Sequence, residues 1–331
     1  MPAIKLEKRG HQAWITLDRP EAKNMLNGDA FVELADAWQE VRNDDAIRVA
    51  VLTAAGEEDF CCGGDLAKVI PLWTGAKQPE TLVEERLLAD PTIPDKIMLK
   101  GEPLYKPVIA AINGRALGGG TELLQATDIR IAADHAQFAL PEPKVGIVPG
   151  AGSMVRLTRQ LPWAHAMKIL LGGASVSAQE ALAMGLVSEV VPLAQLQARA
   201  EHYAEAICSQ APLALQAIKR TALETHTMPW DEAFQYEMGQ AGVVMMSKAM
   251  AIEFGPQNVR LNSVCPTFIK TPLTAPTFAD PERLAWIMDK IKLPRIGETS
   301  DIMGAAVFLA SDASAMVTGT SMLIDGGWTA D

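Results

Sequence analysis

The chain has 331 residues, enough for one large domain or two smaller ones, and 49% of them are hydrophobic and 21% charged, as is ordinary for a soluble globular enzyme. A formal net charge of −11 argues against a nucleic-acid-binding protein, although a local basic patch could still bind an anionic ligand. The 4 cysteines and 5 histidines lack metal-ligand spacing, so we expect reduced thiols and no metal. The sequence shows no signal-peptide core and no apolar run of about 18 residues, and we expect a cytoplasmic location.

Short apolar strands and amphipathic helices alternate along the first part of the chain. Between 28 and 43, apolar residues recur at helical spacing, whereas the run at 107–112 is continuously apolar, as in a buried strand. By themselves these periodicities predict an α/β protein. The predicted strands are 3–8, 12–17, 48–53, 107–112 and 128–133, and the predicted helices are 28–43, one from about 65, and 121–126.

A triple glycine, Gly118 to Gly120, lies between the strand at 107–112 and the next helix. Glycines there let backbone N–H groups face a ligand, and the helix N-terminus adds a positive field, so the arrangement suits an oxyanion. Glu122 follows directly, and Glu142 lies 20 residues further on, between two prolines. Two glutamates near an oxyanion site could transfer protons.

The loop at 60–66, Phe-Cys-Cys-Gly-Gly-Asp-Leu, is the second informative motif. It resembles the Phe-Cys-Ala-Gly-x-Asp-Leu pattern of the crotonase superfamily, specifically of enoyl-CoA hydratases, with Cys62 and Gly64 where alanine is common. The resemblance covers residues 1 to about 240. It implies the crotonase (ClpP/crotonase-like) fold, an α/β spiral of ββα units followed by a helical region. It also places two oxyanion N–H donors at Gly64 and Gly119, where they would stabilise the enolate formed when water adds to the double bond.

The resemblance assigns separate roles to the two glutamates. Glu122 would hold and activate the water, and Glu142 would exchange the proton at Cα, both from the same side of the substrate for syn addition. Members that isomerise, hydrolyse or decarboxylate usually keep one glutamate or neither. Retention of both therefore favours hydration of a 2-enoyl-CoA to a 3-hydroxyacyl-CoA, or the reverse dehydration, in the degradation of fatty-acid or related acyl-CoA.

Coenzyme A is part of this implied substrate, and no metal or redox cofactor is implied. Its adenine and pantetheine parts should run along residues 20–25 and the 63–67 loop. Lys23 is a candidate phosphate contact, with a solvated lysine as the alternative. The expected contacts of the CoA thioester are Ala22, Lys23, Gly63, Asp65, Leu66, Ala67, Gly118 and Pro141.

Two further segments bear on the site. In this superfamily residues 67–106 line the acyl pocket, although ordinary helix packing explains any single apolar residue there equally well. The apolar residues in question are Trp73, Leu82, Leu87, Leu88, Ile97, Met98 and Leu104. After the second catalytic loop, the family usually has Gly-Gly-Thr-Gln-Arg-Leu, whereas residues 152–157 are Gly-Ser-Met-Val-Arg-Leu.

The resemblance divides the chain into a spiral core at 1–192 and a helical region at 193–240, which in the family builds a trimer, often doubled to a hexamer. Helices are predicted at about 193–208, 211–223 and 229–240. From about 241 to 331 the chain instead resembles the C-terminal third of a short-chain dehydrogenase/reductase, through Asn-Ser-Val-x-Pro-Thr at 262–267 and Ile-Asp-Gly-Gly at 324–327. We expect a truncated α/β tail with helices at 242–255, 281–293 and 300–310 and strands within 260–271 and from 322.

An NAD-dependent oxidoreductase is not expected from this tail. No dinucleotide fingerprint follows an N-terminal strand, and a Tyr-x-x-x-Lys pattern starting at Tyr236 would need lysine where Gln240 stands. Two alternatives to a hydratase stay open: an isomerase or another CoA-thioester lyase of the superfamily, and a catalytically weakened fusion or scaffold protein. The strands of the tail would also need new partners, because their parent sheet is absent.

Overall fold

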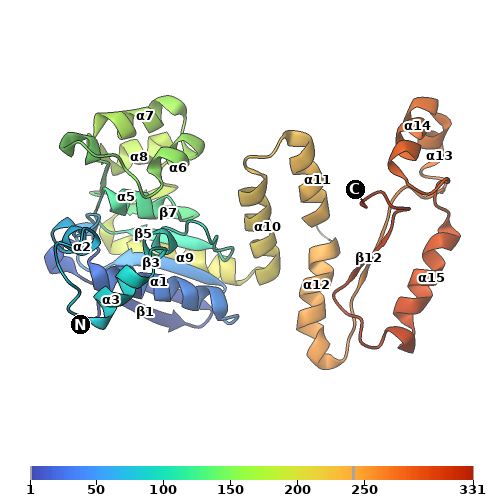
Figure 1. Cartoon of the computed structure of the whole chain (residues 1–331), viewed down its shortest axis with the longest axis horizontal. Helices are drawn as coiled ribbons and strands as arrows, with labels where there is room; N and C mark the ends of the chain where they lie inside the picture. The colour runs from blue at the N-terminus through green and yellow to red at the C-terminus, as the bar shows by residue number, and fades with distance from the viewer. Residues whose placement is uncertain (1, 241–242, 331) are drawn as a thin grey trace. The chain divides into compact units, whose positions relative to one another are not determined.

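The computed structural model describes residues 2–240 and 243–330. It forms two compact units, Met1–Gln216 and Ala217–Asp331, which are drawn in Figure 1 and described separately below. The domain limits predicted after 192 and 240 stay predictions. Ala241 and Gly242, where the change of family and the following helix were predicted to start, lie outside the described residues.

A six-stranded sheet forms the centre of the first unit. Its order is β1-β2-β3-β5-β7-β10, with β1 antiparallel to β2 and the other neighbours parallel. The predicted strands are confirmed within a residue or two at each end; the last strand had not been assigned. The bounds are Ile4–Arg9, Gln12–Leu17, Val49–Ala54, Val108–Ile112, Ile129–Ala133 and Glu189–Val191.

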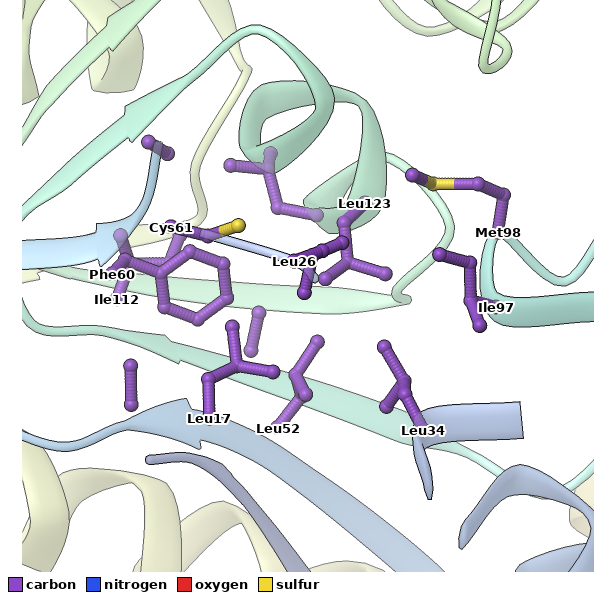
Figure 2. Close-up of a cluster of buried hydrophobic side chains, with 14 of the residues drawn as sticks. Leu17, Leu26, Leu34, Leu52, Phe60, Cys61, Ile97, Met98, Ile112 and Leu123 are labelled. Atoms are coloured by element: carbon purple, nitrogen blue, oxygen red, sulfur yellow. The ribbon is translucent and has the colours of Figure 1, made fainter. Parts of the chain in front are cut away.

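The central strands of this sheet are buried on both faces, which explains the continuous apolar runs of β3 and β5. Along β3, Val49 and Val51 face one side, where they pack with helix α9 (Leu193–Cys208). Ala50 and Leu52 face the other side and join the main core with α1 (Gly28–Asn43). Figure 2 shows that main core, in which Leu17 and Leu52 from the sheet, Phe60, and Leu123 from α5 gather together.

The chain passes repeatedly from the first sheet to a second sheet of shorter strands, so its ββα units form a spiral. Its order is β4-β6-β8-β9, with bounds Asp59–Cys61, Arg115–Leu117, Gln137–Ala139 and Val176–Ser177. Each of β3, β5 and β7 is followed by one of these strands and then by helical structure: α2 (Leu66–Trp73), α5 (Gly119–Leu124), or η2 (Glu142–Val145) with α6 (Ser153–Gln160). The ββα repeat is therefore confirmed. Strands of two or three residues are too short to show an alternating pattern, so periodicity did not predict them individually.

Helix α5 begins at Gly119, two residues before the predicted start. Gly120 sits in its first turn against β4, where an added Cβ would lie 1.9 Å from the carbonyl oxygen of Cys61. This close approach places the start of α5 directly on the 60–66 loop. The remaining helices of the unit are α3 (Leu82–Ala89), α4 (Ile93–Ile97), α7 (Trp163–Gly172) and α8 (Ala178–Met184), and α10 (Pro212–Thr225) spans the division between the units.

The second unit contains a two-stranded sheet in which β11 (Ser263–Pro266) and β12 (Ser321–Ile324) pair in parallel. The tail strands thus pair with each other. A small core of Ile287, Ile291 and Ile296 packs with Phe268 and Trp328. The helices are α11 (Trp230–Gln240), α12 (Val243–Phe254), α13 (Ala275–Ala279), α14 (Pro281–Lys290) and α15 (Thr299–Ala310). Over the described parts of the chain, every helix is too short or too polar to traverse a bilayer.

Candidate active site

A cavity of about 510 Å³ opens in the first unit where the two glycine loops meet. Its lining comes from the loop after β4, the start of α5, the segment after β8, and α4 with the loop after it. Both predicted glutamates and both predicted oxyanion glycines line it. The lining residues are Leu26, Phe31, Cys62, Gly63, Gly64, Leu66, Trp73, Pro94, Asp95, Met98, Lys100, Gly118, Gly119, Glu122, Pro141, Glu142, Val145, Ile147, Val148, Gly150 and Ala151.

The backbones of Gly64 and Gly119 approach each other closely at this cavity. A Cβ built on Gly119 would be 3.7 Å from the amide nitrogen of Gly64. In the β-bridge between Leu26 and Gly64, the Gly63 carbonyl accepts from the Leu26 N–H and the Asp65 N–H donates to the Leu26 carbonyl. The Gly64 N–H takes no part in these hydrogen bonds. The Gly119 N–H belongs to the first residue of α5, which has no acceptor within its helix. Both N–H groups therefore remain available as donors at the cavity.

Glu122 is buried in the first turn of α5, with 3% of its surface exposed. The Ser153 N–H, at the start of α6, donates to Glu122 Oε1 over 3.0 Å. Burial raises the pKa of Glu122 above its ordinary value, and hydrogen bonds from Ser153 and Ala151 with the charge of Lys100 partly offset this. Glu122 is therefore a carboxyl held in place whose proton affinity exceeds that of a surface glutamate, as a general base requires.

Glu142 is the first residue of the short η2 turn that follows β8. Its pKa is raised by burial and, beyond that, by the negative charge of Glu122. Its Oε2 is buried and has no hydrogen-bond partner among the described residues. A Cβ on Gly118 would lie 3.0 Å from Glu142 Oε1, so glycine at 118 leaves room for this carboxyl. A raised pKa favours the protonated form that a proton donor needs.

The predicted CoA-thioester contacts fall into two groups. Gly63, Leu66, Gly118 and Pro141 line the cavity. Asp65 is buried instead and forms an ion pair with Arg19 at 3.4 Å, which ties α2 to the segment before α1. The cavity lining does not include Ala22, Lys23 or Ala67; Lys23 and Ala67 are exposed on the surface. Contact of this second group with a substrate stays a prediction.

The apolar residues of 67–106 also separate in the structure. Trp73 and Met98 line the cavity, and Trp73 packs edge-on against Phe31 with ring centroids 5.7 Å apart. Leu87, Ile97 and Leu104 are part of the main core, and Leu82 is exposed. Ordinary packing thus accounts for these core leucines and isoleucine.

Several lining residues were not anticipated from the sequence. Phe31 looked like a core residue of the helix at 28–43, and Asp95 and Lys100 lie in a stretch without a motif. Lys100 and Asp95 form an ion pair at 2.7 Å beside the cavity. Nothing in the local pattern distinguishes them from solvated surface charges. No cluster of three or more histidine, cysteine, aspartate or glutamate side chains suited to a metal occurs within 2–240 or 243–330.

Known proteins are similar to this chain in both sequence and fold. The chain is 43% identical to the (E)-benzylidenesuccinyl-CoA hydratase of Thauera aromatica over 235 residues, which is 70% of this chain and 87% of that protein. It is 41% identical to the enoyl-CoA hydratase EchA19 of Mycobacterium tuberculosis over 236 residues, 71% of this chain and 86% of that one. The crystal structure of an enoyl-CoA hydratase from Bacillus anthracis matches with a TM-score of 0.64 and 32% identity, covering 76% of this chain and 96% of that chain.

Two family models match the chain, and they overlap. The model of the enoyl-(acyl carrier protein) reductase family matches residues 205–329, which confirms the predicted reductase-like C-terminal segment. The model of the enoyl-CoA hydratase/isomerase family matches residues 7–250. Relatives named as hydratases at 37–43% identity support the predicted hydro-lyase. The family-model match and these relatives show that the chain belongs to the enoyl-CoA hydratase/isomerase family.

Proposed function

We propose that the chain hydrates a 2-enoyl-CoA to the 3-hydroxyacyl-CoA, or catalyses the reverse dehydration. The observation that carries this proposal is one cavity lined by the buried Glu122, the half-buried Glu142 and the closely approaching backbones of Gly64 and Gly119. An isolated oxyanion site would suit many reactions of thioesters. Adding water across a double bond needs, in addition, one group that accepts a proton and one that donates a proton.

In the proposed reaction the thioester carbonyl oxygen lies between the N–H groups of Gly64 and Gly119. Glu122 takes a proton from water as the water oxygen bonds to Cβ, and the electrons of the double bond move to the thioester oxygen as an enolate. The two amides stabilise that enolate; losing one such donor typically costs about 2.7–4 kcal/mol of transition-state stabilisation. Glu142 then delivers its proton to Cα, and the enolate electrons form the new C–H bond.

The cavity supports a partly apolar acyl group. Phe31, Trp73 and Met98 supply apolar surface, and Lys100 with Asp95 supplies one polar position. Relatives named for benzylidenesuccinyl-CoA and for short-chain enoyl-CoA share this family, so acyl groups of different shapes are accommodated within it. We place the reaction in the degradation of fatty-acid or related acyl-CoA, in the cytoplasm.

Hydration of crotonyl-CoA, followed by loss of the enoyl absorbance, tests the proposal. Glu122→Gln and Glu142→Gln should each lower kcat by about 10²–10⁴-fold, the usual contribution of a general acid or base. Activity unchanged by both substitutions would refute the mechanism. Product analysis separates the isomerase alternative, because isomerisation consumes no water. Neither binding of NADH nor a redox reaction is expected.

We further propose a homotrimer or hexamer as the working assembly. Light scattering of the full chain and of a variant ending at 240 distinguishes two roles of the tail. A trimer or hexamer that truncation leaves intact would make the tail an appendage. Loss of the assembly together with activity would favour a tail that maintains the oligomer.

A further inference from the structure

Ser153 is completely buried at the start of α6, yet it is a polar residue beside the cavity. Its N–H donates to Glu122 Oε1 over 3.0 Å. The crotonase motif usually has glycine here, which has no side chain. The hydroxyl of this chain's Ser153 therefore adds a group at the carboxyl of Glu122 that the usual motif does not supply.

Gln125 donates a hydrogen bond to that hydroxyl and so makes its oxygen an acceptor. It lies at the end of α5, is 2% exposed, and its Nε2 donates both to Ser153 Oγ over 2.8 Å and to the carbonyl of Thr121 over 3.0 Å. Because the Ser153 oxygen accepts from Gln125, its own hydrogen is left to be donated elsewhere. The Ser153 amide already donates to Glu122 Oε1 over 3.0 Å, so the same residue brings its hydroxyl beside this carboxyl, where the hydroxyl hydrogen would lower the Glu122 pKa.

We infer that Gln125 and Ser153 form a buried relay of hydrogen bonds, Gln125 to Ser153 to Glu122, that fixes the Glu122 carboxylate for its work as the base. Both are positioning residues: the cavity lining includes neither of them, and they act through Glu122. The Ser153 amide binds Glu122 Oε1, and the Glu122 residue also lines the cavity in which the proposal places the water. This inference rests on the proposed hydratase function.

The relay is anchored at its far end. Gln160, at the end of α6, donates from Nε2 to the backbone carbonyl of Gln125 over 2.9 Å. Helices α5 and α6 are thus joined at both ends of the relay, by Ser153–Glu122 and by Gln160–Gln125. A carboxyl held from two helices has little freedom to change its rotamer.

Three other charged groups face Glu122 and must be considered in any test. They are Glu142 on the loop after β8, Lys100 after α4, and Arg156 on α6. All three remain unchanged when Ser153 or Gln125 is substituted. A difference between wild type and variant therefore reports on the relay and not on these charges.

The experiment is the pH dependence of kcat and KM for crotonyl-CoA hydration by the full chain. Ser153→Ala removes a donor to the charged form of Glu122, so its pKa should rise and the acidic limb of the kcat profile should move to higher pH. We expect a move of about one pH unit, with kcat about tenfold lower on the limb, from the usual strength of a hydrogen bond to a charged group. KM should change less than about twofold, because the hydroxyl does not touch substrate in this proposal.

Gln125→Met, which keeps the length of the side chain and removes its donors, should shift the limb in the same direction by less. The double variant should shift no more than Ser153→Ala alone, because both act through one hydroxyl. Ser153→Gly gives the same comparison with the residue that the family motif usually has. Thr127→Val is the matched control: it removes another buried hydroxyl of the same region, which donates to the Leu124 carbonyl over 2.7 Å, and should leave the profile in place.

An acidic limb that stays at the wild-type pH in Ser153→Ala overturns the relay, and so do additive shifts in the double variant. Thermal melting of each variant shows that it is folded at the assay temperature. Absence of hydration in the wild type would instead refute the proposed function. In that case, NMR titration of ¹³C-labelled glutamate still tests the relay, which predicts a higher pKa for Glu122 in Ser153→Ala than in wild type.

Discussion

Substituting Gly120 by alanine probes how the oxyanion site is built. The added Cβ would lie 1.9 Å from the carbonyl oxygen of Cys61 and 2.7 Å from its carbonyl carbon, whereas ordinary contact begins near 3.4 Å. The backbone of α5 and that of β4 must therefore separate by about 1.5 Å, the difference between 3.4 and 1.9 Å. No flexible side chain can absorb this movement, because the contacts are with backbone.

Such a separation carries the neighbouring Gly119 amide away from Gly64. Oxyanion donors act over about 2.7–3.1 Å, so a shift of this size removes one of the two donors and should lower kcat about 10²–10³-fold. Overpacking of a close-packed contact also costs about 1–3 kcal/mol of folding free energy. Crotonyl-CoA kinetics and thermal melting measure the two effects on the same samples.

The matched control is Gly172→Ala at the end of α7. A Cβ there would meet nothing within 4 Å, and the residue has no positive φ. Stability and kcat should both stay at wild-type values or rise slightly. If Gly120→Ala folds and keeps wild-type kcat, the two amides do not form the oxyanion site, and the argument from close approach is wrong.

Three further predictions concern stability. Burial raises the pKa of Glu142 above its unfolded value, so protonation of Glu142 stabilises the fold at low pH, and this contribution is lost as pH rises through the folded pKa. Glu142→Gln should therefore have a higher melting temperature than wild type at pH 8 and an equal one near pH 4. The reverse order would contradict the assigned burial. Asn27→Ala removes the N-cap of α1, where the side chain accepts from the Ala30 N–H over 3.0 Å, and should cost about 0.5–2 kcal/mol in urea unfolding; no loss would mean that water replaces the cap. Phe60→Ala empties a fully buried position of the main core and should cost about 3–5 kcal/mol, with a cost under about 1 kcal/mol contradicting the packing seen in Figure 2.

Much of the fold and of the candidate site followed from local sequence. Strands such as β3 and β5 were predictable because both faces of their sheet are buried, which leaves a continuous apolar run. Gly64, Gly119, Glu122 and Glu142 were predicted because the loops that carry them resemble motifs of the crotonase superfamily, and all four line the cavity. The change of character in the tail was likewise a property of its motifs.

Other features were decided only by the tertiary structure. Leu87, Ile97 and Met98 all lie in the core, yet only Met98 also lines the cavity, although all three are apolar residues of one variable stretch. Periodicity within the stretch does not say which of these side chains will also reach the cavity. The short strands of the second sheet are stabilised by pairing with residues about 20 to 55 positions away, which no local window contains.

The relay at Glu122 is the plainest example. In the sequence Ser153 is a small change within a helix start, and Gln125 is an unremarked polar residue near a helix end. Folding brings α5 and α6 together and buries both residues away from water, so Gln125 donates to the Ser153 hydroxyl and the Ser153 amide donates to Glu122. The sequence determined which chemical groups this protein has, and the packing of distant segments decided which of those groups meet.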